Sequence, residues 1–324
     1  MTICPRANKK FDSLLKIDRQ AENSPMMSGL TSKPEISDID RKSYRFSHAV
    51  SQDGVFYLVA VPPILDKATR VLVTVHGISR NVEEHARLFA EQCLGNSWLV
   101  VAPLFAEPDH HGYQRLDCAN NAGALRSDEV LNNLLAEVAV MHGVDTRSFC
   151  LFGFSGGAQF SHRYTLLHPQ RVSRLALASA GYYTFPDREV SFPRGLRIKK
   201  NRHQLVWQLE AAFLVPTAVF VGETDCLRDA SLRTGKRVDA QQGVNRVKRA
   251  EAWVRAIRLA VDRRGLQTPV SLTRLADCSH DFDECMKRGK LGAEVLSFFQ
   301  RPVADGRPLS HHTSSGGDSL RFVL

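Results

Sequence analysis

The alternation of two kinds of segment along the middle of the chain constrains the fold more than any other feature. Short apolar segments rich in β-branched residues are typical of strands buried on both faces of a sheet, and they recur at Val71–Val75, Trp98–Ala102, Phe149–Phe152, Leu175–Ala178, Thr217–Val221 and Val270–Arg274. Between some of them, apolar residues recur at helical spacing, as from Val130 to Val138 and from Val244 to Val261. This alternation predicts an α/β fold, with a mostly parallel central sheet and helices on both faces.

A hairpin is expected ahead of the first of these buried strands. Residues 44–51 and 55–61 have strand character and flank Gln52-Asp53-Gly54, a sequence typical of a tight turn. We therefore expect two antiparallel strands at the start of the sheet.

Composition divides the chain into three parts. Residues 1–40 are polar, with Asn-Ser-Pro, Ser-Lys-Pro and few apolar anchors, which predicts a poorly ordered leader. Residues 301–324 are rich in Ser, Gly and His and predict a flexible tail. Residues 41–300 contain neither a Pro/Ser-rich linker nor an internal repeat, so we expect one continuous catalytic domain there.

The charge balance is basic, with 43 Lys and Arg against 34 Asp and Glu, for a net charge of +9. The basic residues are spread along the chain, and no zinc-finger spacing, RNP-like aromatic motif or basic tail accompanies them. We therefore expect a solvated basic surface and no nucleic-acid partner. An attraction for anionic substrates stays open.

The remaining composition argues against several other classes. The N-terminus lacks the apolar stretch of a secretory signal, and no segment is long enough to span a membrane, so we expect a cytoplasmic protein. The histidine pairs His110-His111 and His311-His312 are adjacent, so their side chains diverge, and the seven cysteines have no zinc-site spacing. We expect no metal and no cofactor. A disulfide among Cys226, Cys278 and Cys285 is left open, as is the oligomeric state.

The strongest local signal is Gly153-Phe154-Ser155-Gly156-Gly157, which follows an expected strand directly and precedes a helix-like run. In a G-x-S-x-G motif the serine occupies a sharp, strained strand-to-helix turn that leaves room only for small residues on either side. The turn exposes the hydroxyl, and it places the backbone N–H of Gly156 at a helix N-terminus, where it can stabilise an oxyanion. The alternative is a Gly-rich turn that only binds an anion or packs tightly.

At this motif the chain resembles the α/β-hydrolase superfamily, in which the order is Ser, then an acid after a later strand, then His after the last strand. The resemblance implies that Ser155 is the nucleophile, that Asp225 is the acid in Gly222-Glu223-Thr224-Asp225, and that His280 is the base. Glu223 and Asp229 stay open as alternatives for the acid, because both lie near the same strand end. In such a triad the acid orients the imidazole, which takes the serine proton and returns it to the leaving group.

The resemblance also extends to the loop after the expected strand Val71–Val75. This loop begins His76-Gly77-Ile78, which resembles the family's His-Gly, and it implies that the backbone N–H of Ile78 is the second oxyanion donor beside Gly156. We expect the His76 side chain to hold the loop. More finely, the chain is similar to capless or short-capped esterases such as polyhydroxybutyrate depolymerase-like and feruloyl-esterase-like proteins. Dienelactone hydrolases carry cysteine where this chain has Ser155, which counts against that activity.

Two segments are expected to form the substrate pocket. Residues 181–186 and 105–113 follow strand ends on the same edge as the serine, and their aromatic side chains suit an apolar acyl or alcohol group: Tyr182, Tyr183, Phe185, Phe105 and Tyr113. The alternative is that these rings only pack the loops. About 35 residues, with one helix near Asn201–Phe213, precede the next strand, which predicts a short or absent cap.

Together these features predict a serine hydrolase that cleaves a carboxylic ester of a small or medium substrate through an acyl-enzyme. An amide, thioester or peptide hydrolase would use the same three residues, because the acyl half-reaction is shared. A hydrolase fold that binds a ligand without catalysis is the third alternative.

Overall fold

The structure is a computed structural model, and it describes residues 43–116, 125–198 and 205–302. The chain divides between Asp38 and Ile39, and all of the described residues belong to the second unit. The expected leader at 1–40 and the expected tail from residue 303 onward lie outside the described residues.

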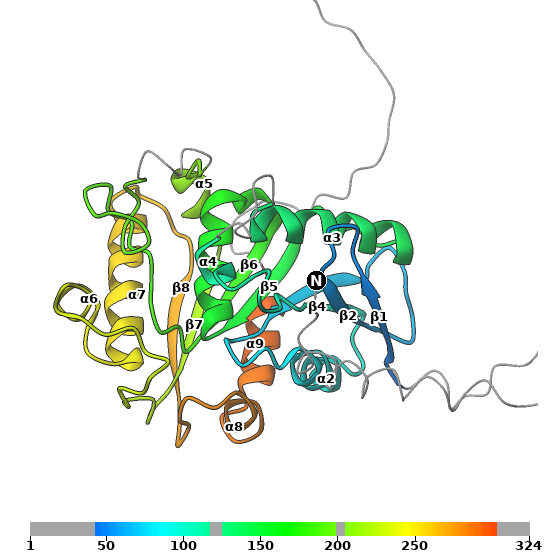
Figure 1. The fold of residues 1–324 in the computed structure, drawn as a ribbon. Coiled ribbons are helices and arrows are strands. Elements are labelled where there is room, and N and C mark those ends of the chain that lie inside the picture. The colour runs from blue at the N-terminus through cyan, green and yellow to red at the C-terminus, as the bar shows by residue number, and fades with distance from the viewer. Residues whose placement is uncertain (1–42, 117–124, 199–204, 303–324) are drawn as a thin grey trace, which may run out of the picture. The chain divides into compact units, whose positions relative to one another are not determined.

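Among the described residues, eight strands form one sheet with the order β1-β2-β4-β3-β5-β6-β7-β8 (Figure 1). Every buried strand expected from the sequence is present and extends one to three residues beyond the expected segment, whereas the two hairpin strands are slightly shorter than expected. The strands are β1 Arg45–Val50, β2 Phe56–Val61, β3 Arg70–Val75, β4 Trp98–Pro103, β5 Phe149–Phe154, β6 Val172–Ala178, β7 Thr217–Gly222 and β8 Val270–Leu275.

The first two strands form the expected hairpin, and antiparallel pairing ends there. β1 pairs with β2, and β2 pairs with β4, in antiparallel register. From β4 through β3, β5, β6 and β7 to β8, all neighbours are parallel. The expected mostly parallel sheet is therefore confirmed.

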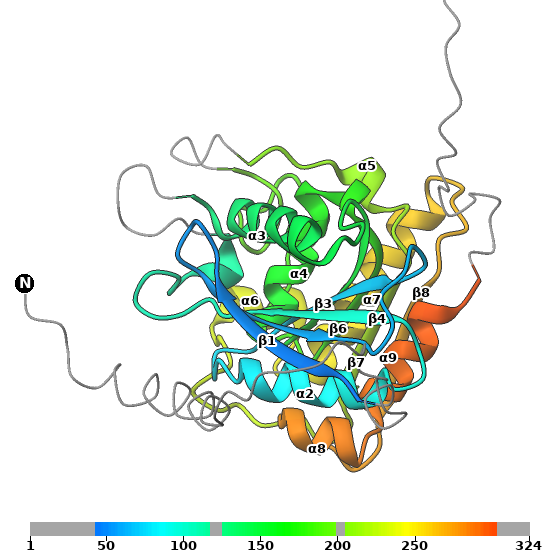
Figure 2. The same cartoon turned by 90° about the vertical axis from the view of Figure 1, so that its right-hand side faces the viewer.

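Helices cover both faces of this sheet (Figures 1 and 2). One apolar core lies between the sheet and the helices α3, α4 and α7, and a second lies between the sheet and α2, α8 and α9. Side chains of a strand alternate between these cores, as Val71 and Val73 do with Leu72. The helices are α2 Val82–Gln92, α3 Ser127–His142, α4 Gly156–Leu167, α5 Leu209–Ala212, α6 Lys236–Gln242, α7 Arg246–Asp262, α8 Phe282–Lys287 and α9 Leu291–Gln300.

The strand order creates a switch point between β3 and β5. The chain passes from β3 through α2 to β4 on one side, then returns through α3 to β5 on the other side of β3. Ligands of open α/β sheets bind at such a point, outside the carboxyl ends of the strands. The loop that begins at His76 and the turn at Ser155 both leave the sheet here, because Val75 pairs with Gly153.

The segment between β6 and β7 contains less helix than expected. The sequence predicted a helix from Asn201 to Phe213, but in the described part of this range only Leu209–Ala212 is helical. The described residues directly before it are not helical, and tertiary hydrogen bonds hold them: the indole of Trp207 donates to the Leu196 carbonyl, and the Gln208 N–H donates to the Leu166 carbonyl. Within the described residues the cap is therefore short, as expected.

Candidate active site

Ser155 occupies a strained turn between β5 and α4. Its backbone has φ 53° and ψ −111°, a conformation that non-glycine residues adopt rarely. The glycines around it allow close packing: a Cβ on Gly153 would lie 2.4 Å from the Gly157 backbone, and one on Gly157 would lie 2.0 Å from the Val75 carbonyl oxygen. The small residues of the motif are therefore required by contact with the turn and with β3.

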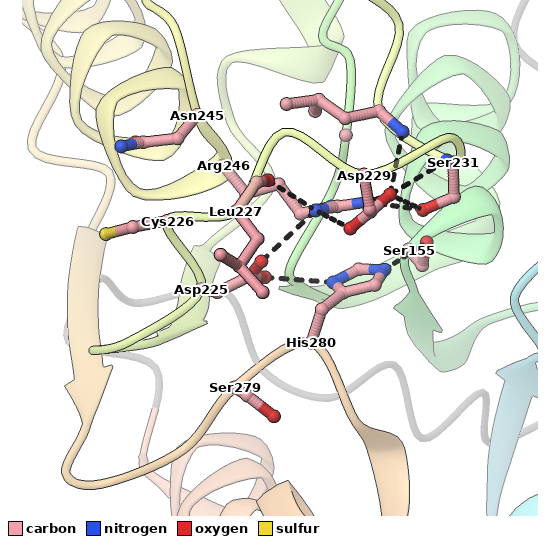
Figure 3. A network of polar contacts seen from close by, with 12 residues as sticks. Ser155, Asp225, Cys226, Leu227, Asp229, Ser231, Asn245, Arg246, Ser279 and His280 are labelled. Atoms are coloured by element: carbon pink, nitrogen blue, oxygen red, sulfur yellow. Dashed lines mark hydrogen bonds and ion pairs between the residues drawn. The ribbon is translucent and has the colours of Figure 1, made fainter.

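The side chains of Ser155, His280 and Asp225 form a hydrogen-bonded line (Figure 3). Ser155 Oγ lies 3.0 Å from His280 Nε2, and His280 Nδ1 lies 2.9 Å from Asp225 Oδ2. Because a carboxylate only accepts, Nδ1 carries the hydrogen and Nε2 is left free to accept the serine proton. The imidazole also stacks on Phe154, with ring centroids 5.4 Å apart.

The imidazole meets Asp225 and neither of the two alternative acids. The Asp225 side chain is fully buried, whereas Glu223 is exposed. Asp229 instead binds Arg246, whose hydrogen bonds hold the pKa of the Asp229 carboxyl well below its usual range. Burial and the short bond to Nδ1 make Asp225 the group that can orient His280.

Arg246 is a buried charge at this site that the sequence did not reveal. It begins α7, and its guanidinium lies between Asp225 Oδ1 at 3.3 Å and Asp229 Oδ2 at 2.9 Å (Figure 3). The second terminal nitrogen, Nη2, donates to Ser231 Oγ at 2.5 Å. Periodicity placed this residue on an apolar helix, and its partners lie 15 to 21 positions away in a loop, so no local signal marks it.

The loop after β3 is held by His76, which is fully buried. The backbone N–H of Phe105 donates to Nε2 at 3.0 Å, so Nδ1 carries the ring hydrogen and donates to the Gly77 carbonyl at 2.7 Å. Burial lowers the pKa of His76 to about 4, which keeps the ring neutral at neutral pH. The side chain is thus a structural histidine, as expected.

The same contact orients the backbone N–H of Ile78. The C=O and N–H of a trans peptide point in opposite directions, so a fixed Gly77 carbonyl fixes the N–H of the next residue. The Ile78 nitrogen lies 3.4 Å from the position that a Cβ on Gly156 would take. The two expected oxyanion donors are therefore neighbours, and the Gly156 N–H belongs to the first turn of α4, where amides have no partner within the helix.

Of the five aromatic residues expected in the substrate pocket, three are fully buried in the core. Tyr183 stacks on Trp253, and Phe105 stacks on Tyr113. The Tyr113 hydroxyl donates to the His76 carbonyl at 2.8 Å and so supports the loop after β3. For these rings the structure matches the alternative that they pack the loops.

The other two rings differ in position. Phe185 is partly buried and packs against the same core. Tyr182 lines a cavity of about 890 Å³ that also borders the loop after β3 at Ile78 and the start of α4 at Gln159. Tyr182 is therefore the one residue of the predicted aromatic set that lines this cavity among the residues the structure describes.

The cysteines near the site are free thiols. Cys278 and Cys285 are buried and Cys226 is exposed. Burial raises the pKa of both Cys278 and Cys285, so these thiols are protonated at neutral pH.

Within the ranges that the structure describes, no group of His, Cys, Asp and Glu is arranged to hold a metal ion. In the same ranges, no helix has the length and apolar character needed to cross a membrane.

Comparison with known proteins gives structural neighbours only, since no family model and no curated protein matches the sequence. The poly(aspartic acid) hydrolase-1 of Sphingomonas sp. KT-1 is 20% identical with a TM-score of 0.64, over 80% of this chain and 98% of that one. A poly(3-hydroxybutyrate) depolymerase of Bordetella parapertussis is 22% identical with a TM-score of 0.65, over 82% and 93%. A fluorophosphonate-binding serine hydrolase of Staphylococcus aureus is 11% identical with a TM-score of 0.52, over 80% and 99%.

At these identities the likeness is one of fold. The alignments with these neighbours take in most of this chain, including its eight-stranded sheet, and each neighbour is covered almost completely by the present chain. The chain therefore has the α/β-hydrolase fold.

Proposed function

We propose that this chain is a serine hydrolase that cleaves a carboxylic ester of a small or medium substrate through an acyl-enzyme. The observation that carries the proposal is the line of hydrogen bonds from Ser155 through His280 to Asp225, which begins at a strained serine at the head of a helix. The fold adds support, because solved structures named as hydrolases share it.

In the proposed reaction, His280 Nε2 takes the hydroxyl proton as Ser155 Oγ attacks the ester carbonyl. The carbonyl oxygen becomes an oxyanion between the N–H groups of Gly156 and Ile78. The intermediate then collapses, the C–O bond to the alcohol breaks, and His280 gives its proton to the departing oxygen. Asp225 stabilises the imidazolium that exists between these two transfers.

Water completes the cycle by the same route. His280 accepts a proton from a water molecule, whose oxygen attacks the acyl carbon of the acyl-serine. The second tetrahedral intermediate then collapses, the bond between the acyl carbon and Ser155 Oγ breaks, and His280 returns the proton to Oγ as the carboxylic acid leaves.

The test is to compare Ser155→Ala with the unchanged protein. We expect a fluorophosphonate to label the unchanged chain at Ser155 in a one-to-one ratio. We expect Ser155→Ala to retain the same circular dichroism and to lose aryl-ester hydrolysis by about 10⁴-fold or more. Activity of the variant within tenfold of the unchanged protein would refute the serine-hydrolase proposal, and a folded chain that neither labels nor hydrolyses would favour a non-catalytic binding protein.

Amide cleavage is the second candidate. The neighbour named as a poly(aspartic acid) hydrolase acts on a polymer whose residues are joined by amide bonds, and the residues proposed here would serve either bond. An aryl ester and the matching anilide of the same acid separate the two candidates. We expect the ester to be cleaved with the higher kcat/KM, and faster cleavage of the anilide would replace the ester proposal.

We also propose that residues 41–300 make up the whole catalytic domain. All of the residues assigned roles above lie between His76 and His280. A chain truncated to 41–300 should retain the kcat of the full chain on an aryl ester, and a folded but inactive truncated chain would show that a terminal segment takes part.

A further inference from the structure

Two adjoining cavities lie beside the loop that follows β3 and begins at His76. The first, of about 890 Å³, begins at Ile78 and Gln159, and Gln159 is bonded through its backbone N–H to the Ser155 carbonyl. The second, of about 500 Å³, lies next to it. The two cavities share four lining residues: Tyr182, Phe192, Pro193 and Arg233.

Their lining is rich in arginine. Glu107 and Glu189 are the two carboxylates in it. Against them stand six arginines: Arg80, Arg115, Arg194, Arg197, Arg233 and Arg237. Tyr182, Phe192 and Pro193 add apolar surface to the part of the lining that the two cavities share.

Protein carboxylates neutralise only part of this charge. Glu107 forms an ion pair with Arg80 at 2.9 Å and binds His111 with the same carboxylate. Arg197 contacts only the neutral hydroxyl of Ser191 in the described residues.

In the described part of the chain, the other arginines of the second cavity likewise have no carboxylate partner. Arg194 contacts the carbonyl oxygen of Arg237 and the amide oxygen of Gln241, at 3.4 and 3.5 Å. The side chains of Arg233 and Arg237 have no carboxylate within 4.0 Å in the ranges that the structure describes, and both are exposed. Within the described ranges, Arg233 therefore places a positive charge without a carboxylate partner on the wall that the two cavities share.

A lining rich in arginine favours ligands that carry negative charge. Low-dielectric walls focus the field of like charges inside a cleft and concentrate oppositely charged ligands there. A guanidinium presents a planar fork of N–H donors that matches a carboxylate in two parallel hydrogen bonds. Apolar side chains beside the fork lower the local dielectric and so strengthen the contact.

We propose that the shared wall at Arg233 binds a carboxylate carried by the substrate, so that the preferred ester is anionic. This inference rests on the proposed function and deepens it by naming the substrate class. It assigns to this part of the basic surface a binding role beyond solvation. The carboxylate can belong to the acyl group or to the alcohol, and the experiment below distinguishes these two sources.

The experiment uses two pairs of esters that differ in one charge. In the first pair the acyl group carries the carboxylate: the para-nitrophenyl half-ester of glutaric acid is compared with para-nitrophenyl hexanoate. In the second pair the alcohol carries it: para-acetoxybenzoate is compared with its methyl ester. The measured quantity is the ratio of kcat/KM for the anionic ester to that for the neutral ester.

We expect this ratio to exceed about 10 for one of the two pairs, as a hydrogen-bonded charge pair in a partly desolvated cavity allows. Arg233→Gln should lower the ratio about tenfold, because it removes the charge and the second N–H of the fork. Among the described residues, the Arg233 side chain forms no hydrogen bond or ion pair that the substitution would remove. Arg45→Gln is the matched control: Arg45 is exposed at the start of β1 and lies on neither cavity, so the ratio should not change.

Two results would overturn the inference. If both neutral esters are cleaved at least as well as their anionic partners, the cavities do not select charge, although the serine-hydrolase proposal stands. If the ratio falls equally in Arg233→Gln and Arg45→Gln, the preference comes from the net charge of the chain and not from this wall. An absence of both ester cleavage and Ser155 labelling would defeat the proposed function itself.

Discussion

Replacing the buried Arg246 with methionine tests how Asp225 is held in place. The Asp225 side chain is fully buried and, among the described residues, its carboxylate has two partners: His280 on Oδ2 and Arg246 on Oδ1. Methionine keeps an unbranched apolar side chain, two atoms shorter than that of arginine, and has no hydrogen-bond donor. The substitution therefore leaves one oxygen of a buried carboxylate without a partner.

The expected losses follow from this geometry. Removal of one partner of a buried ion pair destabilises a protein by about 3–5 kcal/mol, so Arg246→Met should lower the free energy of unfolding by an amount in that range. The bond from Asp225 to His280 is retained, so the loss in kcat should be smaller than the roughly 10⁴-fold effect of replacing a triad aspartate. We expect a fall of about 10- to 100-fold, which corresponds to one imperfectly oriented hydrogen bond.

The assay measures kcat and KM on a neutral aryl ester, together with urea denaturation. Asp229→Asn is the matched control, since it weakens the other ion pair of Arg246 without touching Asp225 or His280. A positioning role predicts a fall in kcat with KM nearly unchanged in Arg246→Met, and a kcat close to that of the unchanged protein in Asp229→Asn. If the two variants lose stability but keep the same kcat, Arg246 is a structural ion-pair residue only, and the argument is refuted.

Two further predictions concern the loop after β3 and the stability of the folded chain at acidic pH. Tyr113→Phe removes the hydroxyl that donates to the buried His76 carbonyl, and we expect a loss of about 1–3 kcal/mol in unfolding free energy with a reduced kcat. Tyr164→Phe, which loses a bond to Asn132 away from the site, should cost similar stability without the kcat effect, and equal kcat losses would contradict the role given to Tyr113. Burial lowers the pKa of His76 from 6.5 to about 4, so the unfolded chain binds the proton first as the pH falls. The contribution of His76 to the unfolding free energy is therefore fully present above pH 6.5 and is lost as the pH falls from 6.5 to 4. Between pH 7.5 and pH 5, this residue should lower the unfolding free energy by about 2 kcal/mol. Burial lowers the pKa of His85 and His162 as well, which acts in the same direction. Urea denaturation at the two pH values checks this, and an unfolding free energy that did not fall toward pH 5 would contradict it.

The sequence alone determined those features that depend on residues close together in the chain. The buried strands and the hairpin follow from local apolar pattern and turn residues, and all were observed near their expected bounds. The glycines around Ser155 also carry their reason locally, because the strained turn brings Gly153 and Gly157 into backbone contact. The carboxyl ends of parallel strands meet at one edge of a sheet, so the positions of Ser155, Asp225 and His280 after expected strands, together with the family resemblance, predicted that they lie at the same edge.

The tertiary structure decided whatever depends on side chains that meet from distant segments. Three acidic residues near the end of β7 were equivalent by position, and only packing shows that Asp225 is buried against His280 while Asp229 turns to Arg246. The aromatic residues of the loops were equally ambiguous. Tyr183 packs against α7, about 70 positions later in the chain, and Tyr182, its neighbour, faces the cavity. The arginine lining brings together residues from 80 to 237, and whether each charge is compensated depends on partners that no spacing in the sequence encodes.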